Sequence, residues 1–216
     1  MNYYSVLLSL MFFINCQDTL PPQSIPVSYE FKLTDNLKGK SVLFIGDSQT
    51  SAYGWGWQDI LSKNVGFKMK NTAVLGKTTR WMTNVLEQEL KQKKYDFVFI
   101  FGGVNDIWGG DLPVPTFNRV QKMVNMANDN GALVVVLTGS DKRSAVNPQK
   151  WWKDDYISIY EGYQYLLLNH LEDALVIDTR EVGMDRKKDC GDLYCHYTLH
   201  AHRKLANIVE NTLRMY

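Results

Sequence analysis

The chain has 216 residues, of which 45% are hydrophobic and 22% are charged, and its formal net charge is +1. This length and composition fit a single compact globular domain with a sizeable core. The near-neutral charge leaves no electrostatic footprint for nucleic-acid binding. The chain contains no internal repeat and no low-complexity tract.

The N-terminal segment is apolar and uncharged over residues 1–15, and residues 6–14 are almost wholly hydrophobic. Such a run is too short to span a bilayer but is typical of the core of a signal peptide. It ends at Cys16, as in a bacterial lipoprotein signal, although no Lys or Arg precedes it and Asn15 is bulkier than the usual residue before a lipidated cysteine. We therefore expect residues 1–16 to direct export to the cell envelope or outside the cell. Cys16 is the candidate lipidation site for membrane attachment, and a simple hydrophobic N-terminal anchor is the alternative.

Residues 17–39 are predicted to form a linker or a strap, because three prolines stand there among polar residues without a sustained period. From residue 40 to 216 the pattern changes to alternating strands and helices. The predicted strands are Val42–Ile45, Phe67–Ala73, Phe97–Phe101, Leu133–Leu137 and Leu175–Ile177. The predicted helices lie near residues 55–63, 79–92, 117–129, 156–171 and 199–214.

This alternation predicts a fold of the α/β class. Strands separated by helices pair in parallel and carry helices on both faces of the sheet. The strands at 97–101 and 133–137 are continuous apolar runs, as central parallel strands require. We therefore predict a three-layer α/β/α sandwich around a five-stranded parallel sheet in the flavodoxin-like order.

Small polar residues follow the predicted strands at the sheet edge where parallel sheets place their chemistry. Gly46, Asp47 and Ser48 follow the first strand, and a helix-like segment whose N-terminal amides can bind an oxyanion comes soon after. Gly76 follows the second strand, and residues 103–106 follow the third. The loop after the fifth strand leads to Asp192 and His196. We therefore predict that Ser48 is a nucleophile, the alternative being that Gly46-Asp47-Ser48 is only a turn.

These blocks together resemble the SGNH, or GDSL, hydrolases, over roughly residues 40–212. The resemblance implies a flavodoxin-like sandwich, no cofactor, and hydrolysis of an ester or another acyl group through a covalent acyl-enzyme. It makes Ser48 the nucleophile. The oxyanion hole would comprise the backbone N–H groups of Ser48 and Gly76 and the side-chain amide of Asn105, which are preorganised neutral donors.

The candidate base is His196, because a serine hydroxyl needs a neighbouring imidazole to take its proton. The acid of the family lies three residues before its histidine, but position 193 is Leu here. Asp192, four residues before His196, is therefore the candidate acid, and Asp189 is the alternative. The other histidines are expected to have structural, surface or capping roles: His170, His200 and His202.

The chain has three cysteines, and two of them stand close together beside this segment. If Cys16 is lipidated, Cys190 and Cys195 remain as an even pair, which in an exported protein predicts a disulfide bond. The bridge would hold the loop that presents Asp192 and His196. Two unpaired thiols are the alternative.

Tryptophan residues suggest the class of substrate. Trp108 follows Asn105, and Trp151 and Trp152 lie in the long segment 139–155, which could act as a lid. Because Trp faces can stack on sugar rings, we expect an exported serine esterase that removes an acetyl or other short acyl group from a carbohydrate. Two alternatives stay open: a catalytically silent protein of this fold that binds a glycan or an envelope partner, and a lipid esterase with an apolar trough beside Ser48.

Overall fold

The computed structural model describes residues 33–52, 54–141, 154–192 and 195–216. Cys16, Trp151 and Trp152, the predicted signal segment and most of the predicted strap lie outside these ranges.

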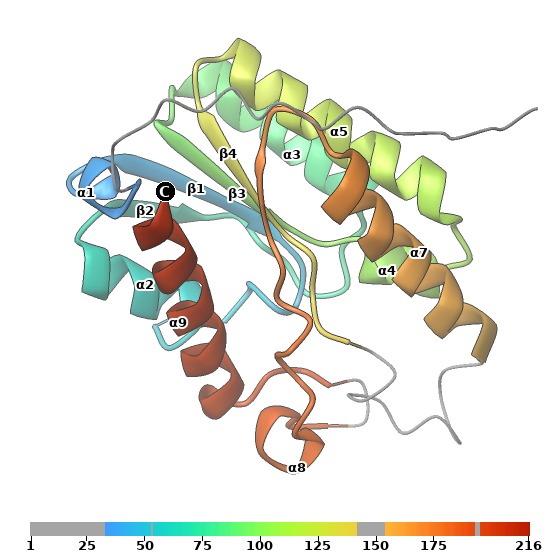
Figure 1. The fold of residues 1–216 in the computed structure, drawn as a ribbon. Helices are drawn as coiled ribbons and strands as arrows, with labels where there is room; N and C mark the ends of the chain where they lie inside the picture. The colour runs from blue at the N-terminus through green and yellow to red at the C-terminus, as the bar shows by residue number, and fades with distance from the viewer. Residues whose placement is uncertain (1–32, 53, 142–153, 193–194) are drawn as a thin grey trace, which may run out of the picture.

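The core of the fold is a five-stranded sheet in which every pair of neighbouring strands is parallel (Figure 1). The strand order is β2-β1-β3-β4-β5, so the predicted flavodoxin-like order is confirmed. The strands are β1 (Ser41–Gly46), β2 (Lys68–Asn71), β3 (Phe97–Phe101), β4 (Leu133–Leu137) and β5 (Leu175–Ile177). All five carboxyl ends therefore face one edge of the molecule, which is the edge where polar residues follow the strands.

Helices cover both faces of the sheet and complete the predicted three layers (Figure 1). One face carries α1 (Leu33–Leu37), α2 (Trp57–Val65) and α9 (Leu199–Met215). The other face carries α3 (Thr79–Gln92), α4 (Val104–Trp108), α5 (Pro113–Asp129) and α7 (Asp154–His170). The short helix α8 (Arg186–Asp189) lies beyond the carboxyl ends of the strands.

Three of these helices have no counterpart among the predicted elements, because α1, α4 and α8 contain only five, five and four residues. A helix that short is less than two turns long and shows no repeating apolar face. Helix α1 lies within the predicted strap, and its last residue, Leu37, is fully buried. This end of the segment is therefore packed on the domain.

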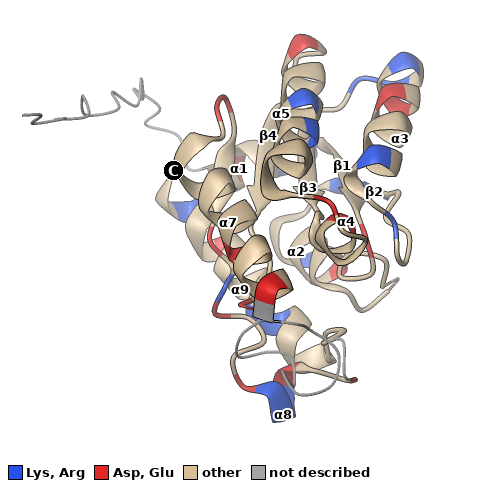
Figure 2. Cartoon of the chain, turned by 90° about the vertical axis from the view of Figure 1, so that its right-hand side faces the viewer, with Lys and Arg blue, Asp and Glu red and all other residues tan. Residues whose placement is uncertain are grey.

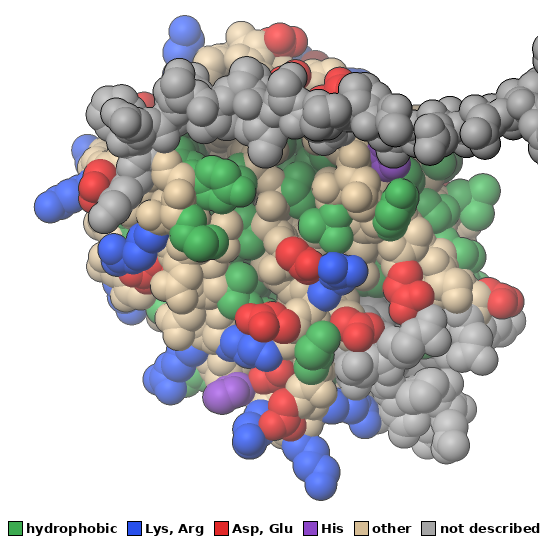
Figure 3. All heavy atoms as spheres, viewed as in Figure 1, with side chains coloured by type: hydrophobic (Ala, Val, Ile, Leu, Met, Phe, Trp, Pro, Cys, Tyr) green, Lys and Arg blue, Asp and Glu red, His purple; other side chains and the backbone are tan. Residues whose placement is uncertain are grey.

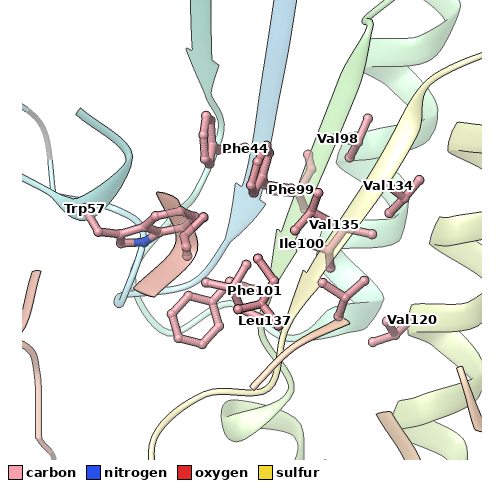
Figure 4. Close-up of a cluster of buried hydrophobic side chains, with 14 of the residues drawn as sticks. Phe44, Trp57, Val98, Phe99, Ile100, Phe101, Val120, Val134, Val135 and Leu137 are labelled. Carbon is pink, nitrogen blue, oxygen red and sulfur yellow. The ribbon is translucent and has the colours of Figure 1, made fainter. Parts of the chain in front are cut away.

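The central strands are buried on both faces, and aromatic side chains dominate the core beside β1 and β3 (Figure 4). Phe44 of β1 stacks on Phe99 of β3 with ring centroids 4.8 Å apart, and it meets Trp57 of α2 edge-on at 5.2 Å. Trp57 is fully buried and is therefore a packing residue. The Phe44, Phe99 and Trp57 cluster fixes α2 against the sheet next to the turn that carries Ser48.

The surface mixes charges of both signs, and no face in Figures 2 and 3 is covered by one sign. Within the described ranges, no helix is both long enough and apolar enough to cross a membrane.

Candidate active site

The turn after β1 places Ser48 at the carboxyl edge of the sheet. A Cβ atom on Gly46 would lie 2.8 Å from the Thr50 side chain and 2.9 Å from the carbonyl oxygen of Phe101, so this sharp exit from the strand needs glycine. The Thr50 N–H donates to the Asp47 carbonyl at 3.1 Å and closes a turn with Ser48 at its second position. The Asp47 carboxylate accepts from the Gln49 N–H at 3.0 Å and stiffens the same turn. Ser48 itself is partly exposed.

The helix predicted near residues 55–63 is observed as α2, but it begins only at Trp57, so its N-terminal amides are not adjacent to Ser48 in the sequence. A tight hydrogen-bonded turn fixes the Ser48 backbone N–H instead. The donor that the resemblance implied is therefore presented by a different local structure.

Two of the three predicted oxyanion donors are uncommitted. Neither the Ser48 N–H nor the Gly76 N–H donates a hydrogen bond to another described residue. Gly76 has φ +72°, a left-handed conformation that glycine adopts without strain, and it is exposed. Because backbone N–H groups are obligatory donors, both are available to solvent or to a bound anion.

The third donor, Asn105, lies between the Ser48 turn and the Gly76 turn. Its side-chain amide donates to the Lys77 carbonyl at 3.0 Å and, over a longer distance of 3.4 Å, to the Asp47 carboxylate. Asn105 thus contacts the neighbour of each of the other two predicted donors. These two bonds tie Asn105 to both of the turns that carry the other predicted donors.

Helix α7 supports the turn that carries Asn105. The Tyr163 hydroxyl donates to the Gly102 carbonyl at 2.9 Å, and a Cβ on Gly103 would lie 2.5 Å from the Tyr163 ring. Gly103 also has φ +106°, so both its backbone angle and its neighbour require glycine. Burial raises the pKa of the Tyr163 hydroxyl well above its ordinary value, which keeps this donor protonated.

A buried carboxylate, Asp106, joins the Asn105 turn to the start of α3. It accepts from the Thr79 N–H at 2.8 Å, from the Thr79 hydroxyl at 2.6 Å and from the Arg119 guanidinium at 2.9 Å. Arg119 also pairs with Asp111. The network fixes the two turns that carry Gly76 and Asn105. Asp106 stands in the block 103–106, but a sequence pattern gives no indication that it bonds to Thr79 and Arg119.

The candidate acid and base contact each other directly. The Asp192 carboxylate lies 2.5 Å from His196 Nδ1 and also accepts from the His196 N–H at 3.0 Å. The alternative acid, Asp189, is buried, accepts from the Gly183 N–H at 2.9 Å and lies 3.7 Å from His200 Nε2. The geometry therefore pairs His196 with Asp192. This contact engages Nδ1 of the His196 ring.

The segment that carries this pair is closed by the Cys190–Cys195 disulfide, with Cα atoms 4.4 Å apart. The Gly191 N–H donates to the His196 carbonyl at 2.8 Å, and the Thr198 N–H donates to the Asp189 carbonyl at 2.9 Å. Backbone hydrogen bonds therefore hold the two ends of this segment together as well. Cys195 has φ +56°, a left-handed conformation that is uncommon for a residue with a side chain. This local turn brings an acid four residues from the histidine into contact with it.

Ser48 and His196 are linked through Gln49. Among the described residues, no hydrogen bond joins the Ser48 hydroxyl to His196. Gln49, however, donates to the Cys195 carbonyl at 2.7 Å and accepts from the Tyr197 N–H at 3.2 Å. The residue after the candidate nucleophile therefore holds the residues on both sides of the candidate base.

The remaining histidines lie apart from this pair. His202 of α9 is buried and its Nδ1 accepts from the Trp57 N–H at 3.2 Å, so it caps the start of α2. Burial lowers the pKa of His202 to about 4, and the ring is therefore neutral at physiological pH. His200 and His170 are exposed.

A predicted substrate residue, Trp108, lies at the end of α4, where 38% of it is exposed. Its ring centroid is 6.4 Å from that of Tyr156 in α7. A cavity of about 750 Å³ opens beside α7 and the segment after β5, and Asp141, Glu161, Asp178 and Arg180 belong to its lining. None of the lining residues is a predicted catalytic, oxyanion or substrate residue, so this cavity does not contain Ser48.

In the part of the chain that the structure describes, no group of three or more His, Cys, Asp or Glu side chains is arranged to hold a metal ion. The candidate donors around Ser48 are amides.

Comparison with known proteins identifies the family and the fold. Residues 44–204 match the family model described as the GDSL-like lipase/acylhydrolase family. No curated protein matches the sequence. Among solved structures, a member of the lipolytic G-D-S-L family from Veillonella parvula superposes with a TM-score of 0.68 at 17% identity and covers 79% of this chain and 96% of its own.

Two esterases also share the fold. An acetylxylan esterase from Geobacillus stearothermophilus has a TM-score of 0.65 at 18% identity, and the match covers 82% of this chain and 94% of the esterase. A psychrotrophic esterase from Pseudoalteromonas sp. has a TM-score of 0.64 at 15% identity and covers 82% and 97%. At these identities the structural matches show the fold, while the sequence match spans most of the domain. The chain therefore belongs to the GDSL-like lipase/acylhydrolase family.

Proposed function

We propose that the chain is a serine esterase that removes acetyl or other short acyl groups from a carbohydrate through a covalent acyl-enzyme. The observation that carries the proposal is the pair of uncommitted N–H groups on Ser48 and Gly76, with the Asn105 amide fixed between their turns. Three convergent neutral donors beside an accessible hydroxyl suit the negative oxygen of a tetrahedral intermediate.

The proposed reaction has two halves. The Ser48 hydroxyl attacks the acyl carbon while His196 Nε2 takes its proton, and the oxyanion accepts hydrogen bonds from Ser48, Gly76 and Asn105. The ester C–O bond then breaks, and the alcohol leaves with the proton from His196. A water molecule, deprotonated by the same imidazole, releases the acid and restores Ser48. Asp192 holds the Nδ1–H tautomer and stabilises the imidazolium that forms in each half.

A carbohydrate carrier is supported by the exposed Trp108 face and by the charged side chains Asp141, Glu161, Asp178 and Arg180 in the lining of the cavity beside α7. Hydroxyl-rich ligands need such hydrogen-bonding groups together with flat apolar faces. One solved structure of the same fold is named an acetylxylan esterase, which supports the same class of substrate.

The test combines labelling and turnover. A fluorophosphonate should label the wild type, and p-nitrophenyl acetate and acetylated xylo-oligosaccharides should be hydrolysed. Ser48→Ala should lose both properties, while Ser158→Ala, which removes an exposed hydroxyl on α7, should keep them. Labelling that persists in Ser48→Ala would rule out this nucleophile, and a wild type inert to every ester would favour a silent binding protein.

A lipid esterase is the second candidate, and one observation favours it. Leu75, next to Gly76, is 65% exposed, and its neighbour Val74 is 39% exposed. Apolar side chains beside an oxyanion donor could contact an acyl chain. Hydrolysis of p-nitrophenyl esters of increasing chain length separates the two candidates, because the carbohydrate esterase should be fastest on acetate and the lipid esterase on long chains.

Export is part of the proposal. The Cys190–Cys195 disulfide supports it, since disulfides persist in oxidising compartments. Residues 1–16 would then serve as the signal and Cys16 as the lipidated residue. In a bacterial host, a labelled lipid precursor should mark the wild type and leave Cys16→Ser unmarked. An unlabelled wild type would remove the lipoprotein part of the proposal.

A further inference from the structure

We propose that Gln49 is a positioning residue that holds the His196 segment at working distance from Ser48. The proposal rests on the proposed esterase function and assigns a role to a side chain outside the acid, the base and the oxyanion donors. Gln49 directly follows Ser48, and only 5% of it is exposed.

The Gln49 amide bonds the main chain on both sides of the candidate base. Its NH₂ group donates to the Cys195 carbonyl at 2.7 Å, and its oxygen accepts from the Tyr197 N–H at 3.2 Å. Cys195 and Tyr197 are themselves buried. A two-way bond of this kind fixes a backbone segment in both position and orientation, because a shift in either direction breaks one bond.

The Ser48 end of this link is equally rigid. The Gln49 N–H donates to the Asp47 carboxylate, and the turn is closed by the Thr50 N–H. The Asn71 side chain adds a bond to the Thr50 carbonyl at 2.7 Å. Gln49 therefore joins two fixed segments.

The geometry separates this role from that of Asp192. Asp192 lies inside the ring closed by the Cys190–Cys195 disulfide and contacts His196, the residue directly after that ring, so their pairing uses no bond from Gln49. Gln49 instead sets where the pair stands relative to Ser48. Loss of Gln49 should slow proton transfer from Ser48 while leaving the contact between Asp192 and His196 in place.

The chemistry requires an amide of this length. Glutamate would keep the acceptor for Tyr197 but would set a carboxylate against the Cys195 carbonyl, and leucine would leave both backbone groups without a partner in a buried place. The Cys195 carbonyl needs a donor and the Tyr197 N–H needs an acceptor, and the amide of Gln49 provides one of each.

The test compares Gln49→Leu and Gln49→Glu with Gln121→Leu in the full chain. Gln121 is a matched control, because its amide makes the same two-way bridge to the backbone of Glu172 at 3.2 and 3.0 Å, between α5 and the segment before β5. On p-nitrophenyl acetate, we expect kcat to fall at least 30-fold in both Gln49 variants, with KM within threefold of the wild type. The acid limb of the kcat/KM profile should keep its midpoint. Gln121→Leu should keep kcat within twofold.

An activity-independent measurement accompanies the kinetics. Hydrogen exchange of a peptide covering residues 195–199 should quicken at least tenfold in the Gln49 variants and stay unchanged in Gln121→Leu. If Gln49→Leu does not fold, Gln49→Glu carries the test with nearly the same volume. Unchanged exchange, or a kcat within threefold of the wild type, would overturn the positioning role. A wild type without ester turnover would instead overturn the proposed function, and the exchange measurement would then decide alone whether Gln49 holds the segment.

Discussion

The Asn105 side-chain amide donates to the carbonyl oxygen of Lys77 at 3.0 Å, and this bond fixes the donor that follows β3 to the turn that follows β2. Gly76 is the residue before Lys77, so the bond links two of the three proposed oxyanion donors. Preorganisation of this kind matters because donors that are already in place need no rearrangement when charge develops.

Removing the Asn105 amide should therefore affect the chemical step more than binding. We expect Asn105→Ala to lower kcat by about 10²–10³-fold, the usual loss for one oxyanion donor, with a small change in KM. Asn84→Ala, on the exposed part of α3, is the control for removing an Asn side chain that takes no part in the proposed site. A decrease below about threefold would reduce Asn105 to a turn residue.

The acid assignment is tested by two neighbouring aspartates. Asp192→Asn should reduce kcat/KM severely, because an amide can no longer stabilise the imidazolium formed on His196. Asp189→Asn should leave kcat/KM nearly unchanged when measured on the folded fraction, because Asp189 bonds Gly183 rather than His196. Steady-state kinetics with circular dichroism decides the matter, and the opposite pattern would assign the triad to Asp189.

The disulfide should matter more for activity than for stability. A ring with a sequence separation of only 5 constrains the unfolded chain by roughly 2 kcal/mol in the chain-entropy model. In a domain of this size, that corresponds to a loss of roughly 4–8 °C in Tm.

We expect dithiothreitol to lower esterase activity well below the unfolding temperature, as the segment with Asp192 and His196 loosens. The double variant Cys190→Ala with Cys195→Ala, measured without reductant, should reproduce that loss and become insensitive to dithiothreitol. Full activity in the double variant would contradict this expectation.

Acid should destabilise the fold through His202. Its pKa of about 4 in the folded chain lies below the ordinary value of 6.5, so the unfolded chain binds a proton more readily. The stabilisation is therefore complete above about pH 6.5 and is lost as the pH falls toward 4. Between pH 7.5 and 4.5 this linkage removes roughly 2–3 kcal/mol. Urea unfolding of the wild type and of His202→Asn, which keeps an acceptor for the Trp57 N–H, measures it. The variant should lose less stability over this range, and equal losses would show that another group governs the acid response.

The pattern of the sequence was sufficient for the sheet and its order because the information is local and repeated. Val42–Ile45 and Phe97–Phe101 are apolar without interruption, and each is buried throughout. Val120, Met123, Val124 and Ala127 repeat on one face of α5, and all four are buried. Such periodicity reports which face meets the core.

The contacts that organise the site could not be read in this way. Gln49 meets Cys195 and Tyr197 across most of the chain, and no local pattern encodes a pairing of that range. The left-handed backbone of Cys195 could not be predicted either, because that conformation is rare outside glycine and asparagine. The same limit applies to His202, whose burial depends on how α9 packs against α2.

The bond between Gln49 and Tyr197 joins residues 148 positions apart, which has a consequence for synthesis. A ribosome extends the chain from its N-terminus, so Ser48, Gly76 and Asn105 all emerge long before His196. A nascent or prematurely terminated product carries the proposed nucleophile and oxyanion donors without the base, and it is inert toward esters for that reason. The proposed activity can begin only after almost the whole chain has been made and its last segment has docked beside the first strand.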